Sequence, residues 1–456
     1  MTKRDWWWIV LVGAVTAAAA FAGVHWPIAA PIAVGSAILV GIAGARPNFL
    51  APVLVLAAIP LMRPNTFGEW SSLWAMCLCI AAALVAFLAD RRAVRLQRSF
   101  VAVGLFVAAM YLWMALIYSQ LGDIPRSVWQ GMELTVIPVA CVAVVCGNRE
   151  RLLLFGKMFI WLMLALCASY AVTALVWVVF GVGAFPLTSY SSYANGIPAT
   201  LYFPFTPSVG GQGIGGVTFP RFGGLGREPG WMGMYCAVAL LIWSRVGKPR
   251  LWGQALLLVG LLGTFSTAGF GALMVGLGVA WLFRRSKTED IAMRYFWFLV
   301  KLAFLAAALW VAVYAPVLGF AAKGDYNAMS LSDRQIATNN GIAAFFTHPM
   351  GGLMSGNLAA INLVAAIAPF GVPFFLIVMG ALLVPRLGHP AARLTTAPVF
   401  VVLVTLLLSQ PAGDSTFVFV LVALVYALAT TRKTEEAPAV EHRLQAGPKC
   451  GSPLSR

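Results

Sequence analysis

The sequence predicts an all-α membrane protein, a polytopic bundle of about 12–14 transmembrane helices. Of its 456 residues, 61% are hydrophobic and only 10% are charged, and the mean hydropathy is +0.87. A soluble domain needs more charge than this to cover its surface. Apolar runs of roughly 17–25 residues recur along the chain, each long enough to cross the ~30 Å hydrocarbon core as a helix. They lack the period-two alternation of a membrane β-barrel.

The apolar runs define the expected helices in chain order. The first run follows Lys3 and Arg4 and resembles a signal peptide, but with so many runs after it we expect an uncleaved first helix. Prolines between 28 and 62 leave a single broken hairpin open there, and the two short runs flanking Ser266–Gly269 are alternatively re-entrant. The expected spans are 6–23, 28–44, 48–62, 71–89, 99–118, 131–147, 154–182, 232–247, 251–265, 268–283, 294–315, 358–384, 394–412 and 415–430.

The net charge of +16 sets the orientation of these helices. If the N-terminus is cytoplasmic, six of the 31 Lys and Arg residues fall outside and the rest lie inside or at inner span ends. This asymmetry follows the positive-inside rule, so we expect both termini in the cytoplasm and no nucleic-acid partner. The six outer residues are Arg63, Arg126, Arg221, Arg227, Lys323 and Arg334.

The chain divides into four expected regions. Residues 1–182 form an N-terminal transmembrane scaffold, and 183–231 form a long outer loop. Residues 232–430 form the C-terminal transmembrane half, which carries a second outer segment near 316–357. Residues 431–456 are polar and contain proline, so we expect a disordered cytoplasmic tail.

The long outer loop concentrates the candidate chemistry. It ends in PRFGGLGREPGW, which places Arg221, Arg227 and Glu228 among glycines, prolines and aromatics. Arginine keeps its charge and binds phosphate oxygens bidentately, so Arg221 and Arg227, with Arg334 from the second segment, are predicted to converge on a pyrophosphate. The alternative is an ordinary solvated or headgroup-facing arginine. Glu228 either acts as a general base or holds Arg227 in place as an ion pair.

Other residues of the two outer segments are weaker candidates. Tyr202 and Trp231 are predicted to stack on sugar rings, although interfacial anchoring explains such aromatics equally. His348, beside Pro349, is a further substrate-binding candidate. Gly210, Gly211, Gly213, Gly215 and Gly216 are expected to form a mobile hinge. The seven cysteines and four histidines are scattered, so no metal site is expected.

The second outer segment is expected to contain a short amphipathic helix on the outer surface. Ser330 and Asp333 have the spacing of a capping box at its start. An apolar face follows, and the helix is expected to stop at His348–Pro349. The residues of that face are Ile336, Ile342, Ala343 and Phe346.

Three motifs in order resemble the O-antigen ligase and polymerase superfamily of bacterial envelope glycosyltransferases. They are RFGGLGREPGWMGMY before a span, GTFSTAGFGALMVGLG between two spans, and DRQIATNNGIAAFFTHPMGGL before a span containing PFGVPFF. Together they cover roughly 215–384, less than half of the chain. Each motif is weak alone, and the ordered set with a consistent outer placement carries the resemblance.

The resemblance implies a GT-C-like enzyme of the bacterial inner membrane, acting on its periplasmic face. An undecaprenyl-pyrophosphate-linked glycan is the implied donor, a glycan the acceptor, and neither metal nor nucleotide cofactor is needed. Arg221 or Arg227 and Arg334 take the arginine roles, so Arg227, Glu228 and Arg334 are the expected catalytic residues. Release of the lipid pyrophosphate drives an inverting transfer. Membrane lipids, a flippase and a chain-length regulator are implied partners.

Two departures from the family pattern bear on the activity. The middle motif usually carries Ser–Arg–Gly, whereas this chain has Ser266, Thr267, Ala268 and Gly269. Ligases carry a histidine about ten residues before the final glycine, and there is none around Ala360–Asn362 before Gly371. Both favour a polymerase of O-antigen or exopolysaccharide repeat units over a ligase that transfers glycan to lipid A-core. A lipid-linked oligosaccharide transporter or flippase remains the alternative from another class.

Overall fold

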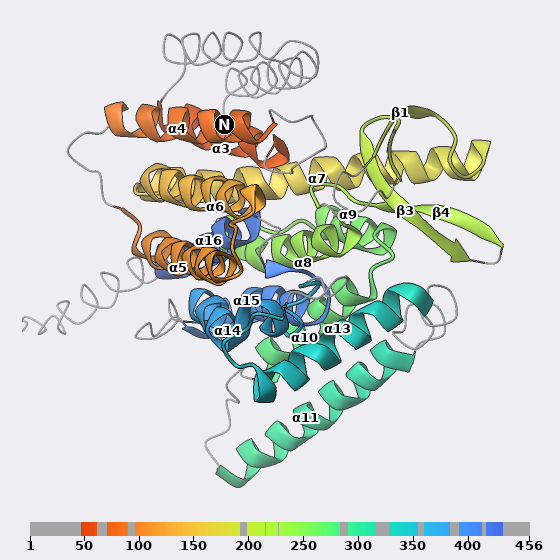
Figure 1. The fold of residues 1–456 in the computed structure, drawn as a ribbon. Coiled ribbons are helices and arrows are strands. Elements are labelled where there is room, and N and C mark those ends of the chain that lie inside the picture. The colour runs from red at the N-terminus through yellow and green to blue at the C-terminus, as the bar shows by residue number, and fades with distance from the viewer. Residues whose placement is uncertain are drawn as a thin grey trace, which may run out of the picture.

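A computed structural model shows a mostly helical protein with one small β-sheet (Figure 1). Thirteen helices and four strands lie in the described part of the chain. That part comprises 47–61, 71–89, 96–191, 198–214, 216–226, 228–282, 291–314, 328–353, 360–383, 392–412 and 416–431. The expected spans 6–23 and 28–44, the tail 431–456, Gly215 and Arg227 lie wholly or almost wholly outside these ranges.

The first helices follow the expected apolar runs closely. They are α3 (Pro47–Leu61), α4 (Ser71–Ala89), α5 (Arg98–Gln120), α6 (Arg126–Val145) and α7 (Arg149–Phe180). The side chain of Asn148 caps α7 by accepting a 2.8 Å hydrogen bond from the amide of Glu150. Within the described residues, α5, α6 and α7 are each long and apolar enough to cross a membrane. At 32 residues, α7 is about 48 Å long and is the longest of the three.

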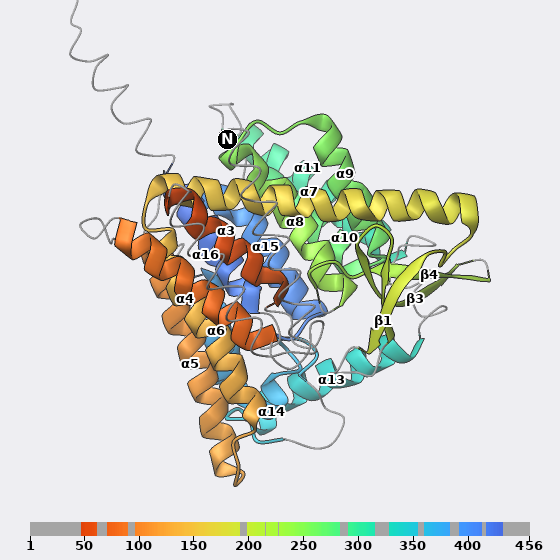
Figure 2. The ribbon, with the colours of Figure 1, turned by 90° about the horizontal axis from the view of Figure 1, so that it is seen from above.

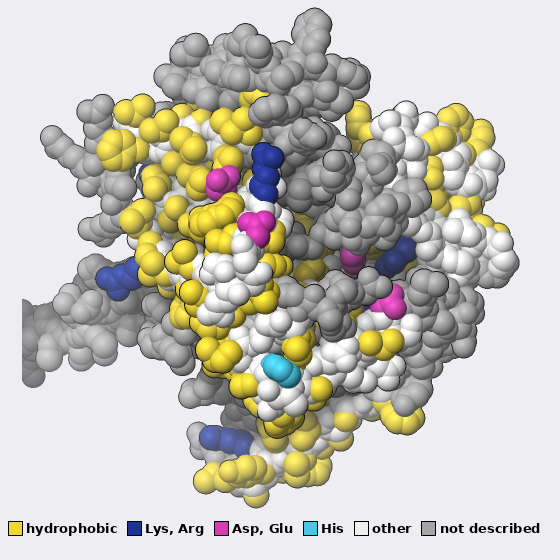
Figure 3. All heavy atoms as spheres, viewed as in Figure 1, with side chains coloured by type: hydrophobic (Ala, Val, Ile, Leu, Met, Phe, Trp, Pro, Cys, Tyr) yellow, Lys and Arg dark blue, Asp and Glu magenta, His cyan; other side chains and the backbone are white. Residues whose placement is uncertain are grey.

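The C-terminal helices pack around two almost fully buried ones. These helices are α8 (Pro229–Val246), α9 (Leu251–Gly263), α10 (Thr267–Leu282), α11 (Ile291–Tyr314), α13 (Ala328–Thr347), α14 (Ile367–Leu383), α15 (Ala392–Leu408) and α16 (Thr416–Thr431). Helices α8 and α16 form the centre of the core, and side chains on all sides of α16 between Phe417 and Ala429 are buried. Hydrophobic side chains dominate the face seen in Figure 3 over α4–α6.

The segment 183–231, predicted to be an outer loop, contains an antiparallel sheet, so the all-α prediction is wrong at this point. Its strands pair in sequence order: β1 (Pro186–Ser191), β2 (Pro198–Tyr202), β3 (Thr206–Ile214) and β4 (Val217–Phe222). Three of the glycines expected to form a hinge lie in β3. Gly211 faces Thr218 of β4 so closely that a Cβ would overlap its methyl group. The absence of a side chain at Gly211 therefore permits close strand pairing.

The sheet is attached to the C-terminal end of α7 (Figures 1 and 2). The hydroxyl of Thr173 donates to the carbonyl of Phe203, at 2.7 Å, and lies 2.7 Å from the hydroxyl of Thr206. The ring of Phe222 stacks on Tyr170 with centroids 4.9 Å apart. These contacts fix β4, and with it the residues that lead into α8.

Helices α8 and α10 cross at two glycines. A Cβ on Gly233 would lie 3.2 Å from the Cα of Gly269, so the backbones approach more closely than larger residues allow. Small residues give this kind of close helix contact in membranes.

We expect Gly233→Leu to destabilise the protein by about 1–3 kcal/mol, because the added side chain must push α10 away. Gly271→Leu on α10 is the control, since a Cβ there meets nothing within 4 Å. Thermal unfolding in detergent measures both. Equal melting temperatures for the two variants would contradict the close crossing.

The segment around α14 differs from the single span expected over 358–384. Helix α14 begins only at Ile367 and is interrupted at Gly371, where φ is +78°. The turn after α13 docks into this break: the amide of Val372 donates to the carbonyl of Pro349 at 2.7 Å. The break thus gives α13 a rigid attachment.

Helix α13 ends at Thr347, before His348–Pro349 as predicted, but Ser330 does not cap it. The helix already includes Ala328, which places Ser330 inside its first turn. The predicted apolar face also points outward. Ile336, Ile342 and Phe346 are exposed, whereas Ala337, Gly341 and Ala344 face the protein. The side of α13 that packs closely against the protein carries small residues. The larger apolar residues lie on the opposite side and take no part in this packing.

Candidate functional site

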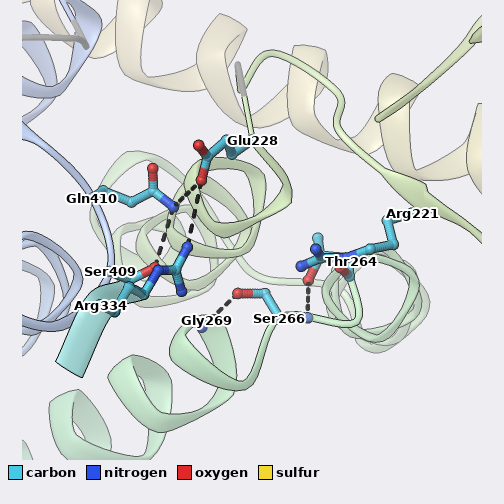
Figure 4. A network of polar contacts seen from close by, with 8 residues as sticks. All are labelled: Arg221, Glu228, Thr264, Ser266, Gly269, Arg334, Ser409 and Gln410. Atoms are coloured by element: carbon cyan, nitrogen blue, oxygen red, sulfur yellow. Dashed lines mark hydrogen bonds and ion pairs between the residues drawn. The ribbon is translucent and has the colours of Figure 1, made fainter. Parts of the chain in front are cut away.

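Five separate segments of the chain meet at one polar cluster (Figure 4). They are the end of β4, the residues entering α8, the turn between α9 and α10, the first half of α13, and the residues that follow α15. In the space-filling view, acidic and basic side chains lie close together beside the sheet, and a second group of both kinds lies farther from the sheet on the same face (Figure 3). In a chain with 10% charged residues, such a cluster is a candidate site.

Glu228 lies at the centre of the cluster. It is the N-cap residue of α8, with extended backbone, and Pro229 follows at the first helical position. Its side chain makes no capping hydrogen bond, so the carboxylate is free to pair elsewhere. Its Oε2 lies 3.6 Å from Nη2 of Arg334 and accepts a 3.2 Å hydrogen bond from Nε2 of Gln410.

Arg334 reaches this carboxylate from α13. Its side chain is 22% exposed and that of Glu228 is 27% exposed, so the ion pair is partly desolvated yet open to a ligand. Two contacts attach α13 here. Asn362 donates a 2.9 Å hydrogen bond to the hydroxyl of Thr338, and Gly341 packs directly on the backbone at Val364.

Arg221 approaches from β4 and is held by the turn between α9 and α10. Its Nε donates a 3.2 Å hydrogen bond to the carbonyl of Thr264. The turn is itself well ordered by side chains. Ser266 caps α10 by accepting from the amide of Gly269, at 3.2 Å, and Thr264 accepts from the amide of Ser266.

The pKa of Arg221 is lowered from its usual value to about 10. Burial is the largest cause and the nearby charge of Arg334 adds to it, while Glu228 partly offsets both effects. The guanidinium groups of Arg221 and Arg334 therefore influence each other electrostatically, and Glu228 only partly offsets their effect. An anion bound between the arginines would relieve their repulsion, so the arrangement favours a phosphate or another multiply charged anion.

The lowered pKa of Arg221 predicts an unusual pH dependence of anion binding. Arginine normally stays charged throughout the accessible range, but Arg221 loses its proton as the pH rises through about 10. We expect thermal stabilisation by sulfate, whose charge is constant here, to decline between about pH 8 and pH 10.5. Without sulfate, the pH trend is the opposite. The free energy of unfolding rises over the same interval, because the unfolded chain binds more protons at Arg221 than the folded protein does.

The control for this measurement is Arg221→Gln. In that variant the sulfate effect should be smaller and should not change across the interval. Undiminished stabilisation of the unsubstituted protein at about pH 10.5 would show that Arg221 stays charged or takes no part in binding.

Among the described residues, the structure brings no other predicted site residue into the contacts of the cluster. Trp231 is 2% exposed and stacks on Tyr235 inside the core, so it offers no ring face to a sugar, and its predicted role is wrong in this conformation. Tyr202 packs edge-on against Trp177, beside α7.

His348 is exposed and contacts the hydroxyl of Thr347 at 3.0 Å. It lies about four helical turns, ~20 Å, along α13 from Arg334. Arg227 lies outside the described residues.

Gln410 and Ser409 belong to the cluster but were not predicted. Both are buried, and Nε2 of Gln410 also lies 3.2 Å from the hydroxyl of Ser409. The available signal was a Ser–Gln–Pro sequence at the outer end of an otherwise apolar run. A polar pair at a span end is usually solvated, and only the fold shows that this pair is covered.

Comparisons with known proteins identify no relative. No protein-family model matches the chain, and no curated protein matches it.

Proposed function

We propose that this chain is a periplasmic-face glycosyltransferase of the bacterial inner membrane that polymerises undecaprenyl-pyrophosphate-linked polysaccharide repeat units. The observation that carries the proposal is the contact between Arg334 and Glu228. Arg221 lies close enough to interact electrostatically with both. These residues come from two segments that are far apart in the sequence and that charge placement puts on the same outer side.

In the proposed reaction, the arginines bind the pyrophosphate of the donor. Glu228 accepts the proton of an acceptor hydroxyl, and the hydroxyl oxygen forms a bond to the anomeric carbon. The bond from that carbon to the pyrophosphate oxygen breaks, and the electron pair leaves with the lipid pyrophosphate. Arg221 and Arg334 stabilise the departing charge, as preorganised donors do for other developing anions.

The ion pair modifies one part of this scheme. From the sequence, Glu228 was expected to be either a general base or the ion-pair partner of Arg227, whereas its contact among the described residues is with Arg334 on another segment. Both roles are compatible, because only Oε2 is engaged by described residues and Oε1 is left for the acceptor.

The test uses a strain that lacks the gene, complemented with the unsubstituted protein, with Arg227→Ala or with Arg221→Ala. Surface glycans are separated on a gel, and membrane insertion is checked by blotting. Single-repeat products without a ladder, in both the deletion strain and the variants, support a polymerase.

Other outcomes support the alternatives. Long polymer left on the lipid carrier, with none on the surface lipid, indicates a ligase. Repeat units trapped on the cytoplasmic side indicate a flippase. An unchanged ladder in the deletion strain rejects the transferase proposal.

A further inference from the structure

Packing alone does not explain why Gln410, a polar residue of the cluster, is buried. It is 1% exposed, and its backbone amide is held by the carbonyl of Thr405 at 3.0 Å. Its carboxamide oxygen is buried and has no hydrogen-bond partner in the described structure. A buried carbonyl without a partner destabilises a protein, so an apolar side chain of the same size would suit this position better.

The polar group that Gln410 does satisfy is Glu228. Its Nε2 donates to Oε2, the same carboxylate oxygen that Arg334 approaches. The two donors fix this oxygen from two directions, from the end of α15 and from α13. The remaining oxygen of Glu228 points away from Arg334 (Figure 4).

The surrounding backbone is shaped to permit this contact. Gly230, in the first turn of α8, lies so close to Gln410 that a Cβ would overlap Nε2. The first turn of α8 can therefore approach the carboxamide only because position 230 lacks a side chain. This close approach brings the residue entering α8, Glu228, within hydrogen-bond distance.

We propose that Gln410 is a positioning residue, which holds the Glu228 carboxylate so that Oε2 stays paired and Oε1 faces the acceptor hydroxyl. The inference rests on the proposed function for the identity of that hydroxyl. The unpartnered carboxamide oxygen of Gln410 lowers the stability of the protein. The amide nitrogen of the same side chain orients the carboxylate that receives the proton. Misplacement of such a group by about 1 Å lowers rates by ~10²-fold.

The first test compares Gln410→Met with Thr405→Val. Methionine keeps the volume and removes the donor, while Thr405 is a buried polar residue of α15 whose hydroxyl bonds only to Val401 among the described residues. For Gln410→Met we expect kcat to fall roughly ten- to hundredfold, with KM for the lipid-linked donor nearly unchanged and an equal or higher melting temperature. Thr405→Val should leave kcat unchanged. An unchanged kcat with a lower melting temperature in Gln410→Met would overturn the proposal, because a space-filling role predicts that result.

A second measurement needs no activity. Melting temperatures of Glu228→Gln, Gln410→Met and the double variant form a thermodynamic cycle, and the two substitutions should be non-additive because the residues share a hydrogen bond. Additivity would reject the coupling even if the protein is a transferase. Non-additivity in a protein that transfers no glycan would reject the proposed function and retain the coupling.

Discussion

Replacing Arg334 with alanine should reduce glycan transfer by ~10²–10³-fold or more while the protein still inserts and folds. Arg334 is the point at which the second outer segment joins the cluster, through its 3.6 Å contact with Glu228. The substitution removes one positive charge from the anion site and leaves Glu228 with Gln410 as its remaining side-chain partner among the described residues. The uncompensated carboxylate would then repel the pyrophosphate that Arg334 had attracted.

The arginine experiment has an informative conservative variant. Lysine preserves the charge but not the planar fork, so Arg334→Lys should recover only part of the rate if the guanidinium binds the pyrophosphate bidentately. Arg126→Ala is the matched control, because Arg126 is an exposed arginine that sequence analysis also places on the outer side. Rates are measured with purified protein in vesicles and a lipid-linked donor. A rate within twofold of the unsubstituted protein for Arg334→Ala would remove Arg334 from the site.

The helices were predictable from sequence because their signal is local. The apolar run predicted at 71–89 is α4, and the one at 251–265 is α9 to within two residues. Their lengths follow from continuous hydrophobic stretches, which need no knowledge of neighbours. By contrast, the break in α14 at Gly371 depends on the docking of Pro349, a contact between segments that the sequence does not announce.

The sheet was missed for a related reason. Its longest strand, β3, contains the sequence VGGQG, and glycine is depleted in strands. These glycines suit the strand only because Thr218 of the neighbouring strand occupies the space that a side chain at Gly211 would fill. A propensity for loops was therefore overridden by pairing with β4.

The candidate site was predictable in part. Arg221, Glu228 and Arg334 were identified because charge is scarce in this chain and the three lie in polar segments outside the apolar runs. Their convergence is visible only in the fold, as are Gln410 and the supporting turn at Thr264–Ser266. Trp231 shows the opposite error, since an aromatic next to the charged motif is part of the core.

Gly341→Leu should abolish transfer as completely as the loss of Arg334, although position 341 touches no charged group of the cluster. A Cβ at Gly341 would overlap the carbonyl oxygen of Val364, which is backbone and cannot rotate aside. Helix α13 must therefore move outward, and because it is a rigid element Arg334 moves with it. A shift of even ~1 Å at a catalytic contact is expected to cost ~10²-fold in rate.

Two measurements separate this effect from general unfolding. Ala343→Leu, on the exposed side of α13, adds the same bulk without a clash and should keep full activity. Hydrogen exchange over 328–347 should accelerate in Gly341→Leu, while exchange in the core helix α16 stays slow, because the lesion loosens one helix and leaves the buried bundle intact. If Gly341→Leu keeps both its activity and its slow exchange, α13 does not depend on this contact. The position of Arg334 would then be set by the other contacts of α13, the hydrogen bond between Asn362 and Thr338 and the ion pair with Glu228.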